Sequence, residues 1–266
     1  MWYNYAIIKG VWRLLNLQKI SKSYARGKVR AVDDLTLEVR RGEIFGFIGP
    51  NGAGKTTTIK MITGILLPDD GAVTINGIDL RREPLTAKRH IGYVPDSHDM
   101  FDRLTGVEYL NFIGDVYGVS PEDRRTRMER YLNLFEIADA AGSPIRSYSH
   151  GMKQKILLTG ALLHRPPLWI LDEPMVGLDP RSALALKEEM RAHAAAGNTV
   201  FFSTHVLEVA ERLCHRIGII SGGRLAAVGT MDELRARGKE NDTLEQLFFE
   251  LTEAGAQDSA GRDGHV

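Results

Sequence analysis

The sequence predicts an α/β fold with a parallel core sheet, an antiparallel β edge subdomain and an inserted α-helical subdomain. Two short apolar runs, "PLWILDEP" (167–174) and "NTVFFST" (198–204), flank the helical stretch 181–197. A strand–helix–strand order of this kind indicates a parallel sheet that is covered on both faces. The stretch "GAVTINGIDL" (71–80) carries a hairpin signal, whereas the segment from about 96 to 164 has helical character.

The strands of the N-terminal part follow from alternation and from turn residues. Strand-like alternation begins near residue 15 and recurs at 35–39. The run "EIFGFIG" (43–49) has the pattern of a short buried strand, and it leads straight into a glycine-rich turn and then a helix. In the hairpin stretch, Asn76 and Gly77 are the turn residues between two short strands.

Two helix starts stand out in the helical segment. Thr105 and Glu108 have the spacing of a capping box, and Ser120 followed by Pro121 is a second start signal. The second helix has one apolar face, which consists of Met128, Tyr131, Leu132 and Phe135. We therefore expect at least two packed helices in this insertion.

The C-terminal part predicts a last strand pair and a capped helix. The strands lie near 217–220 and 225–228, and the helix that follows is capped by Thr230 and Glu233. The residues after about 254 are small and polar, so we expect a disordered tail there.

Composition excludes several classes of protein. Lys+Arg and Asp+Glu are equal at 34 each, so no net field draws the chain to nucleic acid, and we expect no nucleic-acid partner. Cys214 is the single cysteine, which rules out an internal disulfide or a thiolate metal cluster. No apolar run approaches the roughly 18 residues of a membrane-spanning helix. Residues 1–12 are interpreted as an extension before the start of the fold.

The segment "GPNGAGKTT" (49–57), called the phosphate loop below, matches the strand–GxxxxGK[ST]–helix motif. Its glycines let backbone N–H groups wrap phosphates, and the helix that begins near Lys55 adds its positive end. Lys55 is the point charge for the β- and γ-phosphates, and Thr56 supplies a hydroxyl to Mg²⁺. The motif predicts binding of a nucleoside triphosphate through Gly49, Pro50, Asn51, Gly52, Ala53, Gly54, Lys55, Thr56 and Thr57.

The segment "LWILDEP" (168–174) predicts the chemistry. Its apolar residues form a buried strand that delivers Asp172 to the Mg²⁺ site at the carboxyl end of the sheet, where open sheets bind ligands. Glu173 would then point to the water that attacks the γ-phosphate, where a carboxylate can act as general base. Seen alone, the two acids could instead cap a helix. A guanine-reading NKxD motif is missing from the sequence, which disfavours a GTPase.

Five motifs together resemble one family. "GPNGAGKTT", "YSHGM", "LDEP", "GLDP" and "STH" occur in the order and at about the spacing of ATP-binding cassette (ABC) transporter ATPases. The resemblance spans roughly residues 13–235 and implies a P-loop NTPase (RecA-like) core with the helical subdomain at about 96–164. A C-terminal helix and tail would occupy 236–266. "YSHGMKQK" and "EPMVGLDP" are most similar to the stand-alone ATPase subunits of bacterial exporters.

The resemblance implies roles for further residues. Tyr24 occupies the position of the aromatic residue that stacks on adenine, although it could also pack on the strand edge. His205 matches the switch histidine that contacts the γ-phosphate and steadies Glu173. Asp179 resembles the residue that crosses the dimer interface. Asp96 stands where the family usually has glutamine, and it could still reach Mg²⁺ through water.

The "YSHGM" segment raises a separate question, because a glycine lies in the first turn of a helix, where it costs stability. A helix cap with a loosely chosen first turn is one explanation. The resemblance implies another, in which Ser149, His150, Gly151 and Met152 meet the γ-phosphate held by a second subunit. The Ser149 hydroxyl, N–H groups near Gly151 and the helix dipole would all face that anion.

The implied reaction is ATP + H₂O to ADP + phosphate, with Mg²⁺, between two head-to-tail ATPase subunits. The output would be closure and reopening of the pair, because ATP binds the closed state better. A separate transmembrane permease would ride on the helical subdomain, which would place the chain at the cytoplasmic face of the membrane. The alternative is a soluble single-cassette ATPase that acts on a cytoplasmic assembly.

Overall fold

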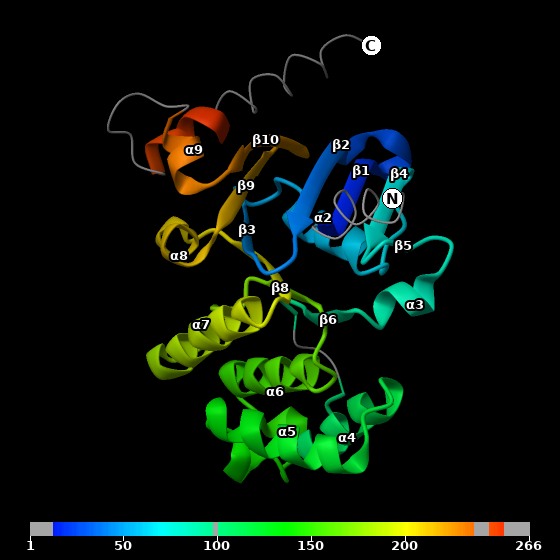
Figure 1. Ribbon diagram of the computed structural model, residues 1–266, viewed down its shortest axis with the longest axis vertical. Coiled ribbons are helices and arrows are strands. Elements are labelled where there is room, and N and C mark those ends of the chain that lie inside the picture. Colours follow the sequence, from blue (N-terminus) through cyan, green and yellow to red (C-terminus); the bar gives the residue numbers. More distant parts are fainter. Residues whose placement is uncertain (1–12, 98–100, 237–244, 253–266) are drawn as a thin grey trace, which may run out of the picture.

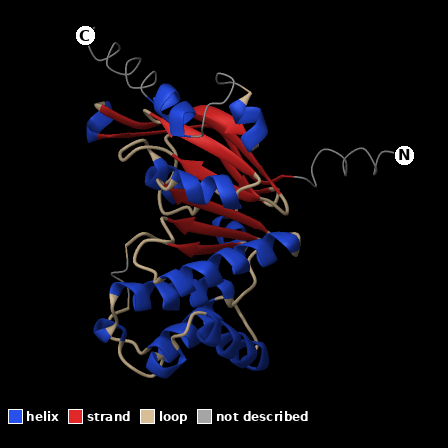
Figure 2. Cartoon of the chain, turned by 90° about the vertical axis from the view of Figure 1, so that its left-hand side faces the viewer, coloured by secondary structure: helices blue, strands red, loops and turns tan. Residues whose placement is uncertain are grey.

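The computed structural model describes residues 13–97, 101–236 and 245–252 (Figure 1). The predicted N-terminal extension and the predicted tail after about 254 lie outside the described residues. Within the described part, the helical subdomain lies at one end of the molecule and two sheets lie at the other (Figures 1 and 2).

The core of the fold is a six-stranded sheet with the strand order β10-β9-β3-β8-β7-β6. Neighbouring strands run parallel, except for the antiparallel pair β9 and β10. The strands are β3 (Ile44–Ile48), β6 (Ile91–Val94), β7 (Leu168–Asp172), β8 (Thr199–Thr204), β9 (Arg216–Ser221) and β10 (Arg224–Gly229). This arrangement confirms the predicted parallel core.

The antiparallel edge is a sheet of its own, with the order β2-β1-β4-β5. Its strands are β1 (Arg13–Tyr24), β2 (Val29–Arg40), β4 (Asp70–Ile75) and β5 (Ile78–Asp79). The turn from β4 to β5 has positive φ at both central residues, 52° at Asn76 and 80° at Gly77. Two positive φ angles are the requirement of a type I′ turn, so the hairpin prediction from the Asn-Gly pair is confirmed.

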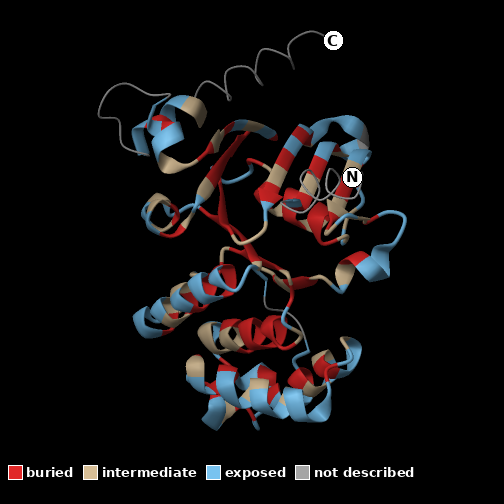
Figure 3. Ribbon diagram, in the orientation of Figure 1, coloured by how far each residue is buried: buried red, intermediate tan, exposed pale blue. Residues whose placement is uncertain are grey.

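The two faces of the parallel sheet are covered by different elements. Side chains that alternate along β7 separate into two clusters: Leu168 and Ile170 pack with α2 (Lys55–Ile62) and the antiparallel sheet. Trp169 and Leu171 pack on the other face with helices α4 (Gly106–Val116), α5 (Pro121–Leu134), α6 (His150–Leu162) and α7 (Pro180–Ala195). Figure 3 shows these strands as the most continuously buried part of the fold. Both faces are thus buried, as a parallel sheet requires.

The predicted helix starts are present. Thr105 and Glu108 form the reciprocal capping box of α4, with the Thr105 amide donating to Glu108 Oε2 at 2.8 Å. Ser120 caps α5, whose first residue is Pro121. Thr230 caps α9 (Met231–Arg235) through a second capping box. Among the residues that the structure describes, no helix combines the length and the apolar character that crossing a bilayer requires.

Three short elements were not predicted. They are the edge strand β6 and the helices α3 (Pro84–Lys88) and α8 (Leu207–Leu213). Each is too short for the hydrophobic period to repeat often enough to stand out in the sequence. Neither α3 nor α8 begins with a side-chain cap, and the start signal present is Pro84 at the first position of α3. The 3-10 turns η1 (Ala25–Gly27), η2 (Ala138–Ala140) and η3 (Ile145–Ser147) complete the described elements.

A further helix at 245–252 packs on the same molecule. Leu247 is only 3% exposed and belongs to a cluster with Ile219 of β9 and Leu234 of α9. The Ser221 hydroxyl donates to the Thr252 carbonyl at 3.2 Å. This helix therefore extends the apolar cover over the β9 and β10 edge of the parallel sheet.

Candidate active site

The phosphate loop joins β3 to α2, and its shape depends on close backbone packing. Gly54 has a φ of 106°, and a Cβ at this position would collide with the carbonyl oxygen of Ala31. Only glycine satisfies both conditions. The Ala53 carbonyl accepts from the Gly223 amide at 3.0 Å, so the turn between β9 and β10 supports the loop from outside.

A cavity of about 250 Å³ lies over the phosphate loop. Almost all of the predicted phosphate-binding residues line this cavity, together with two of the predicted acidic residues. Its lining consists of Ala31, Pro50, Asn51, Gly52, Ala53, Gly54, Lys55, Thr56, Thr57, Asp96 and Glu173. Asp96, which replaces the usual glutamine, therefore lies at this cavity.

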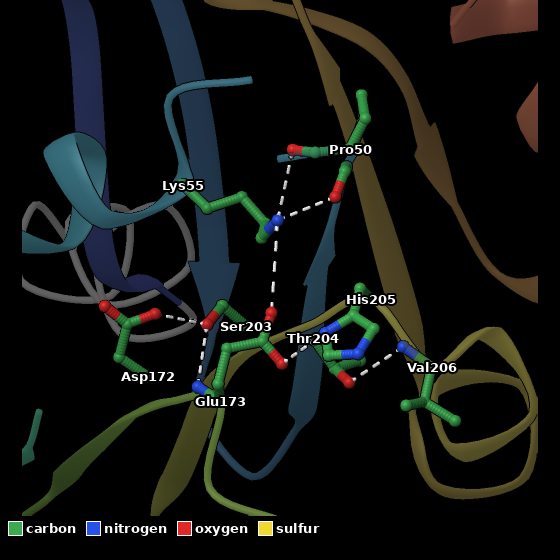
Figure 4. Close-up of polar contacts among 9 residues, drawn as sticks. Pro50, Lys55, Asp172, Glu173, Ser203, Thr204, His205 and Val206 are labelled. Carbon is green, nitrogen blue, oxygen red and sulfur yellow. Dashed lines mark hydrogen bonds and ion pairs between the residues drawn. The ribbon is translucent and has the colours of Figure 1, made fainter. Parts of the chain in front are cut away.

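Lys55 is the first residue of α2, and its side chain reaches back toward the start of the phosphate loop (Figure 4). Its Nζ donates to the carbonyls of Gly49 at 2.7 Å and Pro50 at 3.2 Å, and it lies 4.0 Å from Glu173 Oε1. Burial lowers the pKa of Lys55, while the carboxylates of Glu173 and Asp172 oppose that change. The ammonium group is thus held between the loop carbonyls and the acids, in reach of a phosphate in the cavity.

Asp172 ends strand β7 and is completely buried. The Ser203 hydroxyl donates to its Oδ1 at 2.5 Å. Its Oδ2 is buried without a hydrogen-bond partner among the described residues. Burial raises the pKa of Asp172, and Asp96 acts in the same direction, whereas the hydroxyls of Ser203 and Thr56 oppose the rise. A bound cation would satisfy the unpaired oxygen.

The oxygen atoms at this site suit Mg²⁺, which is usually bound by protein and phosphate together, better than a metal that protein side chains alone would hold. Among the described residues, no three His, Cys, Asp or Glu side chains gather as a metal cage. Mg²⁺ seldom uses such cages, because it keeps waters and combines one or two carboxylates with substrate phosphates. The free Oδ2 of Asp172, the Thr56 hydroxyl and the nearby Asp96 carboxylate have the chemistry of such a site.

Glu173 directly follows Asp172 and faces the cavity. Its φ is 49°, an uncommon value for a residue other than glycine. Its amide donates to Ser203 Oγ at 3.0 Å, and its Oε2 lies 3.0 Å from His205 Nδ1 (Figure 4). His205 follows strand β8, so the ends of two neighbouring strands bring the acid and the imidazole into contact. A carboxylate held in this way can accept a proton from water.

The "YSHGM" segment forms the start of helix α6. Ser149 is the N-cap, and its Oγ accepts from the Met152 amide at 3.3 Å. A Cβ on Gly151 would lie 2.5 Å from the carbonyl oxygen of Gly177, and a Cβ on Gly177 would collide with the His150 ring. The glycine in the first turn therefore admits the backbone of the same chain, whatever else approaches it.

Helix α6 is also tied to the segment that follows Glu173. Gln154 Nε2 donates to the Pro174 carbonyl at 3.1 Å, and Lys155 Nζ lies 2.9 Å from Asp179 Oδ2. Asp179 in turn caps α7, because its Oδ1 accepts from the Ser182 amide at 2.9 Å. Lys155 and the donors of Ser182 hold the pKa of Asp179 well below its usual range. The start of α6 and the segment 174–179 thus form one packed unit.

Comparison with known proteins agrees with this geometry. The ABC transporter family pattern matches residues 32–176, more than half of the chain. The chain belongs to the ABC transporter family. Over 234 residues it is 38% identical to the linearmycin resistance ATP-binding protein LnrL of Bacillus subtilis (strain 168). The aligned region covers 88% of this chain and 74% of LnrL.

Solved structures show the same cassette fold. A structure described as the ATP-binding subunit of an ABC transporter has a TM-score of 0.85 and 39% identity, covering 90% of this chain and 99% of that one. The ATP-binding cassette MJ0796, solved as a dimer in a post-hydrolysis state with ADP and Pi, has a TM-score of 0.74 and 25% identity. That match covers 81% of this chain and 98% of the other. The chain is therefore an ABC ATPase subunit.

The cassette brings some predicted residues together and separates others. Lys55, Asp172, Glu173 and His205 are linked by the contacts described above. Within the described residues, none of the signature segment (149–152) lines the cavity of its own phosphate loop. Tyr24, at the end of β1, is 40% exposed and does not line this cavity either, so its role in stacking stays a prediction.

Four residues that shape the site lie inside the quoted motifs without an assigned role, namely Ser203 in "STH", Gln154 and Lys155 in "YSHGMKQK", and Gly177 in "GLDP". Ser203 is a buried polar residue that directly follows an apolar run, and that contrast is the signal which could have found it. Gln154 is buried as well, but it stands between two lysines and has no such signal in the sequence. Lys155 and Gly177 offer no comparable signal. Their contacts join segments that are distant in the sequence, and a lysine in a helix or a glycine in a turn is common anywhere.

We predict that Gly151→Ala destabilises the cassette. In an unhindered helix, alanine would stabilise by up to about 1 kcal/mol relative to glycine. Here the Gly177 carbonyl blocks the added methyl group, so a net loss of about 1–3 kcal/mol is expected, together with reduced ATPase activity. Urea unfolding of the purified protein measures the change.

Gly142→Ala is the matched control, because a Cβ there meets open space. Its free energy of unfolding should stay within about 0.5 kcal/mol of the parent value. If Gly151→Ala were as stable as this control, the close approach of Gly177 would be contradicted.

Proposed function

We propose that this chain powers a bacterial ABC exporter, by ATP-driven dimerisation and by engaging a separate transmembrane permease. The observation that carries the proposal is the convergence of Lys55, Asp172, Glu173 and His205 beside the phosphate-loop cavity. The relative LnrL is named for linearmycin resistance, which supports export as the direction of transport.

In the proposed mechanism the phosphate loop binds the triphosphate through its amides and the N-terminus of α2. The Lys55 ammonium then gives up its hydrogen bonds to the carbonyls of Gly49 and Pro50 and binds the β- and γ-phosphates instead. Thr56, Asp172 and Asp96 would hold Mg²⁺, which when bound neutralises charge on the phosphates.

Glu173 then acts as general base. The oxygen of a water attacks the γ-phosphorus, the bond from that phosphorus to the bridging oxygen breaks, and the Glu173 carboxylate accepts the water's proton. His205 holds the Oε2 of Glu173 at 3.0 Å and so limits the orientations of that carboxylate. The products are ADP and phosphate.

The signature segment (149–152) is proposed to act on the nucleotide of a second subunit. Its distance from its own cavity supports a role in trans, since it contributes no lining residue within the described chain. The helix α6 starts at this segment, and its positive end suits a γ-phosphate. The dimeric form of the MJ0796 cassette supports a paired arrangement.

The permease is proposed to contact the helical subdomain, which would place the chain at the cytoplasmic face of the membrane. Phe101, Phe112 and Val116 are exposed at 37%, 45% and 56%, and the rings of Phe101 and Phe112 lie 5.6 Å apart. Grouped exposed apolar side chains of this kind mark interaction surfaces. A soluble cassette acting on a cytoplasmic assembly is the alternative that the experiments below address.

The chemical assignment predicts distinct effects of two substitutions. Lys55→Ala should abolish ATPase activity, because the phosphates lose their counter-charge. Glu173→Gln should retain ATP binding and lose about 10²-fold or more in turnover, the usual scale for a general base. Phosphate release and binding of a fluorescent ATP analogue measure the two properties.

Glu188→Gln is the control for the second change, since Glu188 is an exposed carboxylate on α7 that pairs only with Arg191 among the ion pairs of the described chain. It should leave turnover unchanged. Near-normal turnover of Glu173→Gln would remove the general-base assignment.

The trans role of the signature predicts complementation between inactive variants. Lys55→Ala lacks a working phosphate loop, and Ser149→Arg blocks the signature segment. In a mixed homodimer, one site combines both lesions, whereas the other combines an intact loop with an intact signature. Mixing under conditions of subunit exchange, with the permease present, should restore ATPase activity that neither variant shows alone. A role of Ser149 in cis predicts no recovery at any mixing ratio.

The proposed location predicts behaviour on fractionation. Expressed with its native genome neighbours, the protein should sediment with membranes and be released by detergent together with a polytopic protein. If it stays in the soluble fraction of its own host, or sediments with ribosomes, the assembly-ATPase alternative becomes the better description.

A further inference from the structure

Ser203 lies beside Asp172 in the parallel sheet, because the two residues are register partners in β8 and β7. It is completely buried in β8, directly after the apolar run Val200, Phe201 and Phe202. A buried hydroxyl costs stability unless it is hydrogen-bonded. The contacts of Ser203 must therefore explain why a hydroxyl is buried at this position.

The Ser203 hydroxyl makes two contacts, and both lead to the acids of the site. It donates to Asp172 Oδ1 at 2.5 Å and accepts from the Glu173 amide at 3.0 Å. An ionised carboxylate can only accept and an amide N–H can only donate, so the direction of both hydrogen bonds is fixed. One hydroxyl thus bridges the side chain of one acid and the backbone of the next.

Each contact has a consequence for geometry. Binding Oδ1 of Asp172 from one side leaves Oδ2 as the oxygen without a protein partner in the described chain. Holding the Glu173 amide helps to keep that residue at its uncommon φ of 49°. In this conformation the Glu173 carboxylate lies against His205 and 4.0 Å from Lys55.

We propose that Ser203 is a positioning residue of the ATPase site, which orients Asp172 toward Mg²⁺ and Glu173 toward the attacking water. The inference rests on the proposed roles of those two acids. Ser203 itself touches neither nucleotide nor water in this scheme, because it is buried behind both acids.

The test compares nucleotide binding with and without Mg²⁺. Ser203→Ala should weaken Mg²⁺-supported binding of a fluorescent ATP analogue about 10-fold, the low end of what a hydrogen bond to a charged group contributes. Binding in EDTA should stay unchanged, because the phosphate loop is intact. The kcat should fall about 10-fold or more, since Glu173 loses its support as well.

Two further variants separate positioning from general packing. Ser203→Thr keeps the hydroxyl and suits a strand, so it should restore both Mg²⁺-supported binding and kcat. Thr159→Val removes another completely buried hydroxyl, which donates to the Lys155 carbonyl in α6, and it should leave both quantities unchanged. If Ser203→Ala does not fold, Ser203→Cys decides in its place, because a thiol keeps the shape and is only a weak donor.

Equal loss of binding in Mg²⁺ and in EDTA, or parent-like values for Ser203→Ala, would overturn the positioning role. So would a Thr variant as impaired as the Ala variant. Glu173→Gln and Lys55→Ala, measured alongside, keep the two proposals separate. Normal turnover of Glu173→Gln and Lys55→Ala would contradict the proposed function. If those two variants are inactive while Ser203→Ala behaves like the parent protein, only the role of Ser203 is contradicted.

Discussion

The parallel pairing of β3, β7 and β8 is the constraint on which the site depends. In this register Ile48 faces Thr204, and Asp172 faces Ser203. The chain therefore leaves these three strands at their carboxyl ends, on the same side of the sheet, directly after Ile48, Asp172 and Thr204. The phosphate loop, Glu173 and His205 meet there although more than a hundred residues separate the first from the second in the sequence. A shift in the pairing would separate these groups.

A second dependence links the signature segment to the catalytic acid of the same subunit. Helix α6 is joined to the segment after Glu173 by the side chains of Gln154 and Lys155 and by the close approach of Gly151 to Gly177. If the signature contacts a nucleotide on the neighbouring subunit, any displacement of α6 must move this segment, because packed interfaces transmit strain. The two nucleotide sites of a pair would then be connected through protein that belongs to one chain.

Much of the fold and the chemistry could be predicted, for reasons that particular residues illustrate. Lys55, Asp172 and Glu173 follow short apolar strands in motifs whose chemistry permits few other residues. The Asn76-Gly77 turn has a conformation that its residue types favour. Ser203 stood out only as a polar residue after an apolar run, and Gly177 did not stand out, since the importance of both comes from contacts across the sheet or between distant segments. The strand β6 was missed because four residues at a sheet edge carry little periodicity.

The phosphate loop has its shape fixed by the protein's own bonds. Lys55 ties it to the carbonyl of Gly49, the Gly223 amide holds Ala53, and the Thr58 amide donates to Gly54. A loop fastened at three points loses little conformational entropy when a phosphate enters it, so affinity arises mainly from an exchange of hydrogen-bond partners. In the proposed mechanism, more of the binding free energy of ATP would then be available for closing one subunit onto another. A preformed phosphate loop would thus make dimerisation, rather than ordering of the loop, the step that ATP drives.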